Sequence, residues 1–126
     1  MENKSYIWIT TQKEGYHFWE SAPEEVGFLR YPHRHIFGFR VYIQVEHNDR
    51  EIEFFMFKNN VDKLINNIWE TYNLDKYDKA DRVSCEMISD NLNDLVNQLY
   101  PQRDTIIEVD EDKQVGNKKE YNNHNI

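Results

Sequence analysis

Apolar residues alternate most regularly between residues 36 and 46 of the chain. They occupy every second position there: Phe37, Phe39, Val41, Ile43 and Val45. This two-residue period is typical of a strand with one buried face. His33 and His35 continue the same register backwards, so both imidazoles are expected on the buried side.

Three other segments are predicted to be strands. Residues 5–10 (SYIWIT) and 105–109 (TIIEV) are rich in β-branched and aromatic residues, and the polar residues 13–15 are expected to interrupt the first of them. In residues 51–58 (EIEFFMFK) the apolar positions alternate again, after the turn-forming residues 47–50. Residues 51–58 are therefore expected to form a hairpin with the strand before them.

A longer period marks two helices. In residues 59–72 six apolar side chains share one helical face: Val61, Leu64, Ile65, Ile68, Trp69 and Tyr72. A second stripe follows Ser84, which is a favourable N-cap, and ends at Tyr100 and Pro101. Its members are Ile88, Leu92, Leu95, Val96 and Leu99. Residues 24–29, after Pro23, are expected to form a short helical turn.

This order of elements predicts an α+β domain. We expect a four-stranded antiparallel sheet with two helices packed on one face, because amphipathic helices must bury their apolar stripes. The domain is expected to span residues 1–112, followed by a polar C-terminal tail, 113–126, of which residues 122–126 are frayed. A small open sheet also has free edges, so a homo-oligomer is expected.

Composition narrows the function. The 126 residues include 15 Lys and Arg against 23 Asp and Glu, a formal net charge of −8. That charge argues against binding to a nucleic-acid polymer, which needs clustered basic residues. No apolar run is long enough to cross a membrane, and Cys85 is the single cysteine, so there is no internal disulfide. Without a secretory signal at the start, a cytoplasmic location is expected.

The charge is unevenly distributed. Residues 26–45 contain no Asp or Glu, yet they include Arg30, Arg34 and Arg40 together with His33 and His35. This basic segment has two interpretations. It lies on a sheet face paired with carboxylates from elsewhere, or it forms a pocket for a small anion, since arginine binds phosphate and carboxylate with two parallel hydrogen bonds.

The histidines also have two interpretations. His33 and His35 lie two residues apart at the start of a strand, and His17 offers a third imidazole. Three such ligands and a water molecule form an open zinc site. An ordinary hydrogen-bonded pair or an anion contact is equally compatible with the spacing, and Arg34 between the two histidines favours the anion contact.

Five segments in order resemble the 6-pyruvoyl- and 6-carboxytetrahydropterin synthases. They are PHRHIFGFRVYIQV (32–45), REIEFFMFK (50–58), NLDKY (73–77), SCEMISDNL (84–92) and TIIEVDED (105–112). The resemblance covers about residues 5–112. It implies the tunnelling fold, a four-stranded antiparallel sheet with two helices, which matches the order predicted above.

The same resemblance implies roles for individual residues. His33 and His35 match two zinc ligands, and His17 lies near the distance expected for the third, although an insertion around Gly15 would place Gln12 there instead. Three acids match family positions as well: Glu111 for the residue that binds the guanidine-like edge of the pterin, Glu86 for the glutamate at a helix start, and Asp75 for the acid of an Asp-His pair. As alternatives, Glu111 is a solvated acid and Glu86 an ordinary first-turn acid.

Two family positions are altered. Residues 16–32 contain no cysteine, whereas the synthases have their reactive cysteine just before the two histidines, and Cys85 belongs to a different motif. The catalytic histidine beside the aspartate is replaced by Lys76, whose ammonium group would not transfer protons near pH 7. A site that retains its ligand-holding residues and lacks its acid-base residues indicates binding without turnover.

The segments EEVGFLRYPHRHIF, HNDREIEFF and SCEM are also similar to the phage-encoded Thoeris anti-defence sponges. That resemblance implies an oligomer that sequesters a cyclic ADP-ribose signal in the host cytoplasm without cleaving it. Under this interpretation Arg30, Arg34, Arg50 and Arg103 bind phosphates. Ser84 and Cys85 offer backbone N–H groups at a helix N-terminus, and Phe28 or Tyr31 stacks on the base.

We therefore expect non-enzymatic sequestration of a small anionic nucleotide, with no cofactor and with sites at subunit interfaces. The alternative is a zinc-dependent tetrahydropterin or deazapurine synthase that uses His17, His33 and His35 as ligands. A purely structural oligomer is the third possibility.

Overall fold

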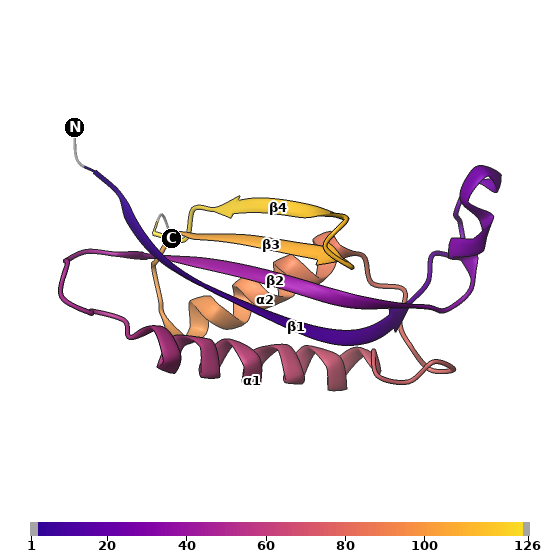
Figure 1. Cartoon of the computed structure of the whole chain (residues 1–126), viewed down its shortest axis with the longest axis horizontal. Helices are drawn as coiled ribbons and strands as arrows, with labels where there is room; N and C mark the ends of the chain where they lie inside the picture. Colours follow the sequence, from indigo (N-terminus) through magenta and orange to yellow (C-terminus); the bar gives the residue numbers. More distant parts are fainter. Residues whose placement is uncertain (1–2, 125–126) are drawn as a thin grey trace.

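The computed structural model describes residues 3–124, in which two α-helices cover one face of a four-stranded sheet (Figure 1). The elements are β1 (Ser5–His17), the 3₁₀ helix η1 (Glu24–Arg30), β2 (His33–Val45), α1 (Phe54–Tyr72), α2 (Cys85–Leu99), β3 (Thr105–Glu111) and β4 (Val115–Tyr121). The sheet has the order β1-β2-β3-β4, with every neighbouring pair antiparallel. The α+β class and the four-stranded antiparallel sheet are thus confirmed.

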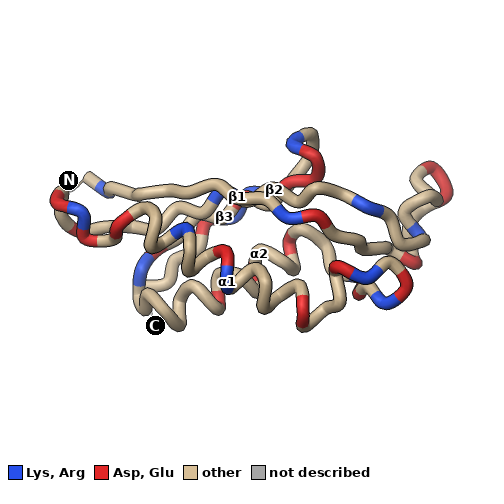
Figure 2. The backbone as a smooth tube through the Cα atoms, turned by 60° about the horizontal axis from the view of Figure 1, so that its bottom comes forward, with Lys and Arg blue, Asp and Glu red and all other residues tan. Residues whose placement is uncertain are grey.

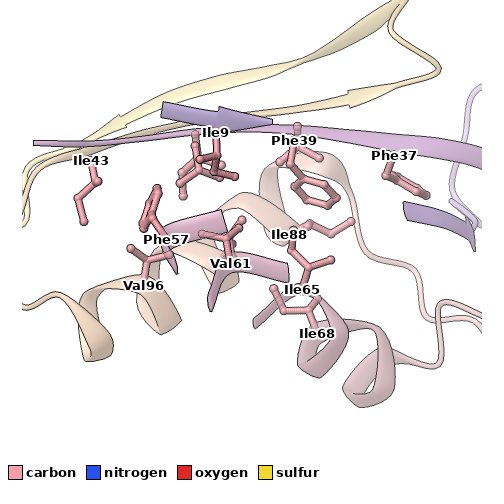
Figure 3. Close-up of a cluster of buried hydrophobic side chains, with 14 of the residues drawn as sticks. Ile9, Phe37, Phe39, Ile43, Phe57, Val61, Ile65, Ile68, Ile88 and Val96 are labelled. Carbon is pink, nitrogen blue, oxygen red and sulfur yellow. The ribbon is translucent and has the colours of Figure 1, made fainter. Parts of the chain in front are cut away.

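The core lies between the sheet and the two helices (Figure 3). The alternating residues of β2 point into it, and Phe37, Val41 and Ile43 are fully buried. The predicted helical stripes meet them from the other side, with Val61, Ile65, Ile88, Leu92 and Val96 among the buried members. Both amphipathic helices therefore bury most of the faces that their periodicity indicated, except that Leu99, the last member of the second stripe, is 51% exposed.

The predicted strand over residues 51–58 is wrong. Helix α1 begins at Phe54, five residues before the predicted start, so β2 has no hairpin partner in this segment. Glu53 explains the difference, because its carboxylate accepts hydrogen bonds from the backbone N–H groups of Phe55 and Met56 and so caps the helix. A short alternating apolar run fits either structure, and here the cap favours the helix.

Two further predictions need correction. Strand β1 runs without interruption through residues 13–15 to His17, paired with β2 along its whole length. The polar tail predicted from residue 113 contains β4, which pairs with β3 despite having few apolar residues. Asn123 is buried and hydrogen-bonded to Asp104 and Asn93, so the frayed end does not include it. Residues 125–126 lie outside the described residues.

The short helical turn after Pro23 is confirmed as η1, and Ser84 caps α2 by accepting a hydrogen bond from the Met87 N–H group. Within residues 3–124, neither long helix combines the length and the apolar character that a bilayer crossing requires.

Candidate metal centre

Three histidines meet where the end of β1 pairs with the start of β2. His17 is the direct partner of His33 in the antiparallel register, and His35 pairs with Gly15. Because alternate residues share a face, all three imidazoles project to the same side of the sheet. Their ring centroids lie 4.6, 4.9 and 5.2 Å apart. The strand register therefore brings His17, His33 and His35 together, as the sequence predicted.

Each imidazole is oriented by an oxygen atom at its Nδ1. His17 Nδ1 lies 2.8 Å from the carbonyl oxygen of Val83, and His33 Nδ1 lies 2.9 Å from that of Tyr31. His35 Nδ1 lies 2.8 Å from the carboxylate of Asp112. These oxygens are acceptors, so each Nδ1 is the donor. Nε2 is therefore the nitrogen through which each ring would bind a further group.

One nitrogen from each ring lies within 4.8 Å of the other two, a separation at which three ligands can share one metal ion. Among the described residues, His35 Nε2 is buried and makes no hydrogen bond, and the nearest carboxylate oxygen, Glu111 Oε1, is 3.5 Å away without hydrogen-bond geometry. A buried nitrogen without a partner is unusual and needs an explanation. Burial and the two neighbouring imidazoles lower the pKa of His33, which favours the neutral form that binds metals.

Glu111 faces the histidines from the end of β3. Its Oε2 lies 3.0 Å from His17 Nε2 and accepts a 3.6 Å hydrogen bond from the Cys85 thiol. The contact with His17 holds the pKa of Glu111 below its usual range against the opposing effect of burial. Both nitrogens of His17 thus face oxygen atoms, Nδ1 toward Val83 O and Nε2 toward Glu111 Oε2.

A pocket of about 440 Å³ opens beside the histidines. His17, His33 and Glu111 line it; Phe18 and Trp19 come from the segment after β1, and residues 82–87 come from the end of the α1–α2 connection and the first turn of α2. The size lies within the range of small-molecule sites. Cys85 and Glu86 also line it, together with the N-cap Ser84.

No model of a known protein family matches the chain, and a search of curated proteins finds no relative.

The end of β1 is anchored to the last turns of α1 and to the α1–α2 connection. The Tyr16 N–H group donates to the carbonyl oxygen of Leu74 at 2.8 Å, and the Trp69 indole N–H group donates to Glu14 O at 2.8 Å. Gly15 permits this close approach, because a Cβ atom at residue 15 would lie 2.9 Å from the Trp69 ring. The register also decides between the two proposed third ligands: Gln12 is an odd number of positions from His17 and faces the other side of the sheet.

The arginines predicted to bind phosphate do not gather at this pocket. Arg34 pairs with Glu14 at 2.8 Å on the opposite face of the sheet from the two histidines beside it. The Arg30 side chain donates to Ala22 O, while Arg50 and Arg103 pair with Asp49 and Glu51. Figure 2 shows basic and acidic positions interleaved along the whole molecule.

Other predicted residues are also separated from the pocket. Phe28 and Tyr31 are 71% and 69% exposed, and neither lines it. Asp75 and Lys76 are exposed in the α1–α2 connection, again away from the lining residues. Burial raises the pKa of the Cys85 thiol, so Cys85 does not supply the thiolate that the resemblance lacks.

Sequence reasoning missed several contributors, Arg82 among them. Trp19 lines the pocket, Val83 orients His17 through its carbonyl oxygen, and Asp112 orients His35. Backbone oxygens leave no signal in a sequence. The sequence did contain a signal for Asp112, because this acid directly follows Glu111 at the end of a strand.

Proposed function

We propose that the chain is a zinc-binding protein whose pocket retains a small heterocyclic molecule beside the metal ion. The supporting observation is the pattern that the three histidines share: Nδ1 donates to an oxygen atom, and one nitrogen of each ring lies within 4.8 Å of the other two. Metal-binding histidines are commonly oriented in this way. Three neutral imidazoles with a fourth position open are also a donor set of catalytic zinc sites.

The residues fit zinc in chemistry and in charge. His17, His33 and His35 would be the ligands, and His35 Nε2, which makes no hydrogen bond within residues 3–124, would gain the metal ion as a partner. Bound zinc supplies a Lewis acid that polarises a ligand oxygen. Glu111 offsets part of the added positive charge and accepts hydrogen bonds from N–H groups of a pocket ligand.

The resemblance to the tetrahydropterin synthases supports a flat ligand with a guanidine-like edge, such as a pterin or a deazapurine. The observed sheet with two α-helices on one face is the architecture that this resemblance implies. Glu111, which the resemblance matches to the acid that binds that edge, lines the pocket. Trp19 offers an aromatic surface beside it.

We propose retention of this ligand and not its conversion. Burial raises the pKa of the Cys85 thiol, and the exposed Lys76 lies outside the pocket lining, so neither residue matches the thiolate and the imidazole base that the resemblance gives to the synthases. Turnover of a dihydroneopterin triphosphate by the zinc-loaded protein would contradict this part of the proposal.

Zinc stoichiometry tests the metal centre. Protein stripped with chelator and titrated with Zn²⁺ should bind one ion per chain, and the double variant His33→Ala/His35→Ala should bind none. Arg34→Ala is the matched control, because Arg34 lies between the two histidines but faces the other side of the sheet. Absence of zinc binding by the unaltered protein would refute the proposal.

Ligand retention tests the pocket. The zinc-loaded protein is mixed with a pterin or a deazapurine, freed of unbound ligand and heated, and the released compound is identified by mass spectrometry. Recovery of the intact ligand supports retention, and Glu111→Gln should reduce it. If neither compound is retained, this ligand class is wrong.

Sequestration of a cyclic ADP-ribose signal is the second candidate, raised by the resemblance to the anti-defence sponges. Arg82 favours it, because this residue lines the pocket next to the first turn of α2, although Glu20 pairs with it at 2.8 Å. The same retention experiment with cyclic ADP-ribose isomers separates the candidates. An isomer retained by the unaltered protein and lost in Arg82→Ala would favour sequestration of the signal.

We also propose that the protein forms a homo-oligomer. Strands β1 and β4 are the edges of the described sheet and offer unpaired backbone groups to another copy. Light scattering coupled to size exclusion tests this directly, and a monomeric mass at micromolar concentration would contradict it.

A further inference from the structure

The β3–β4 hairpin ends in a tight turn next to the histidine cluster. The Gln114 N–H group donates to Glu111 O at 3.1 Å, and the two residues between them, Asp112 and Lys113, have φ values of 58° and 59°. Two consecutive left-handed residues form the turn type that favours Asn and Gly. Asp tolerates this conformation better than most residues.

The side chain of Asp112 connects this turn to β2. Its Oδ1 accepts a hydrogen bond from the Ile36 N–H group at 2.8 Å, and its Oδ2 accepts one from His35 Nδ1 at the same distance. The Asp112 N–H group donates in return to Ile36 O, also at 2.8 Å. The carboxylate is therefore fixed at two points, one of which is the imidazole.

His35 differs from the other two histidines in what orients it. Backbone carbonyl oxygens of Val83 and Tyr31 accept from His17 and His33, and substitutions leave those atoms in place. His35 depends on a side chain. A proton held on Nδ1 leaves the Nε2 lone pair free, and Nε2 of His35 is the buried nitrogen that makes no hydrogen bond among the described residues.

We propose that Asp112 is a positioning residue that fixes the ring orientation and tautomer of His35 for metal binding. This inference rests on the proposed zinc centre. Asp112 does not touch the metal; it acts through His35 and holds the hairpin turn against β2. Removing such an orienting partner costs about 10–100-fold in metal affinity.

The experiment compares Asp112→Ala, Asp112→Asn and Lys113→Ala by zinc competition against a chelator. Asp112→Ala should bind zinc about 10–100-fold more weakly than the unaltered protein. Asp112→Asn should lose less zinc affinity than Asp112→Ala, because the amide oxygen of Asn can still accept a hydrogen bond from His35. Asn also tolerates a left-handed backbone. Lys113→Ala is the matched control, since it places alanine at an equally left-handed position without changing a side chain bonded to β2.

A second readout separates positioning from turn stability. Nitrogen NMR of labelled histidine reports which ring nitrogen of His35 has the proton, with or without zinc. Nδ1 protonation in the unaltered protein and a mixture of tautomers in Asp112→Ala are expected. Unchanged tautomer and affinity in Asp112→Ala would overturn the inference. If the unaltered protein binds no zinc, the proposed function fails, and the NMR comparison still tests what Asp112 does to His35.

Discussion

The two ends of the sheet satisfy their ionisable side chains in different ways. At one end, Arg103 pairs with Glu51, and the same carboxylate accepts a hydrogen bond from the Glu46 N–H group. At the other end, one nitrogen each of His17, His33 and His35 lies within 4.8 Å of the other two, and among the described residues the buried His35 Nε2 makes no hydrogen bond. The first arrangement is complete by itself, whereas the second needs a further atom.

This difference shows that a candidate binding site is identified by side chains that lack a partner within the described structure, and not by the type of residue alone. Arg34 lies between two cluster histidines in the sequence, yet strand alternation turns it to the other face, where Glu14 neutralises it. The basic residues of segment 26–45 are neighbours in the sequence, but the sheet separates Arg34 from the histidines. Closeness in the sequence was therefore not evidence for a shared anion pocket.

The largest expected effect is on zinc binding at the end of the sheet that holds the three histidines. His35→Ala removes one of three ligands and should weaken zinc binding by more than about 100-fold, since loss of residues that merely orient a ligand already costs 10–100-fold. Competition with a chelator measures this. The comparison fails if His35→Ala and the unaltered protein bind zinc equally.

Gly15→Ala should disturb the same end through packing. The added Cβ atom would lie 2.9 Å from the Trp69 ring, and overpacking of this kind costs about 1–3 kcal/mol of unfolding free energy. Urea denaturation measures the change. Gly27→Ala is the control, because its Cβ atom would meet only the Arg30 side chain at 3.7 Å. Equal stability of both variants would show that Trp69 does not constrain this strand end.

At the opposite end of the sheet, where Arg103 pairs with Glu51, Glu51→Gln should lower the unfolding free energy by about 1–2 kcal/mol. The reason is that a hydrogen bond to a charged group becomes a neutral one. Zinc affinity should not change. Asp49→Asn is the matched control, since its pair with Arg50 is exposed on both sides. A zinc defect in Glu51→Gln would contradict the independence of the two ends.

Glu51→Gln should also change how the unfolding free energy depends on pH in the acid range. The hydrogen bond from Arg103 lowers the pKa of Glu51 to about 2 from an ordinary value near 4.5. Its contribution is therefore complete above about pH 4.5 and is lost as the pH falls toward 2. Glu51→Gln should lose less unfolding free energy over this interval than the unaltered protein. Parallel pH profiles would mean that the pair does not form in solution.

The smallest expected effect is that of Arg34→Ala. Exposed pairs contribute little to stability because water and salt screen them, and both members of the Arg34–Glu14 pair are about half exposed. We expect a small loss of stability, greater at low salt, and unchanged zinc affinity. A large loss of zinc binding would mean that Arg34 faces the cluster.

The sequence predicted the parts of the fold that depend on periodicity. The alternation in β2 and the two helical stripes placed the core correctly, and the three histidines were grouped in advance. The start of α1 was missed because the cap at Glu53 outweighs a short alternating run. Strand β4 was missed because an edge strand with polar residues has no apolar period. The orienting oxygens of Val83 and Tyr31 belong to the backbone, which a sequence does not distinguish.

X-ray absorption of the zinc-loaded protein tests the central claim most directly. The account predicts three imidazole nitrogens and one further light atom around each zinc ion, with Zn–N distances of about 2.0–2.1 Å. Three imidazoles can be counted from their ring scattering, and His33→Ala should remove one. A sulfur neighbour at about 2.3 Å would instead make Cys85 a ligand, and fewer than three imidazoles would contradict the histidine centre.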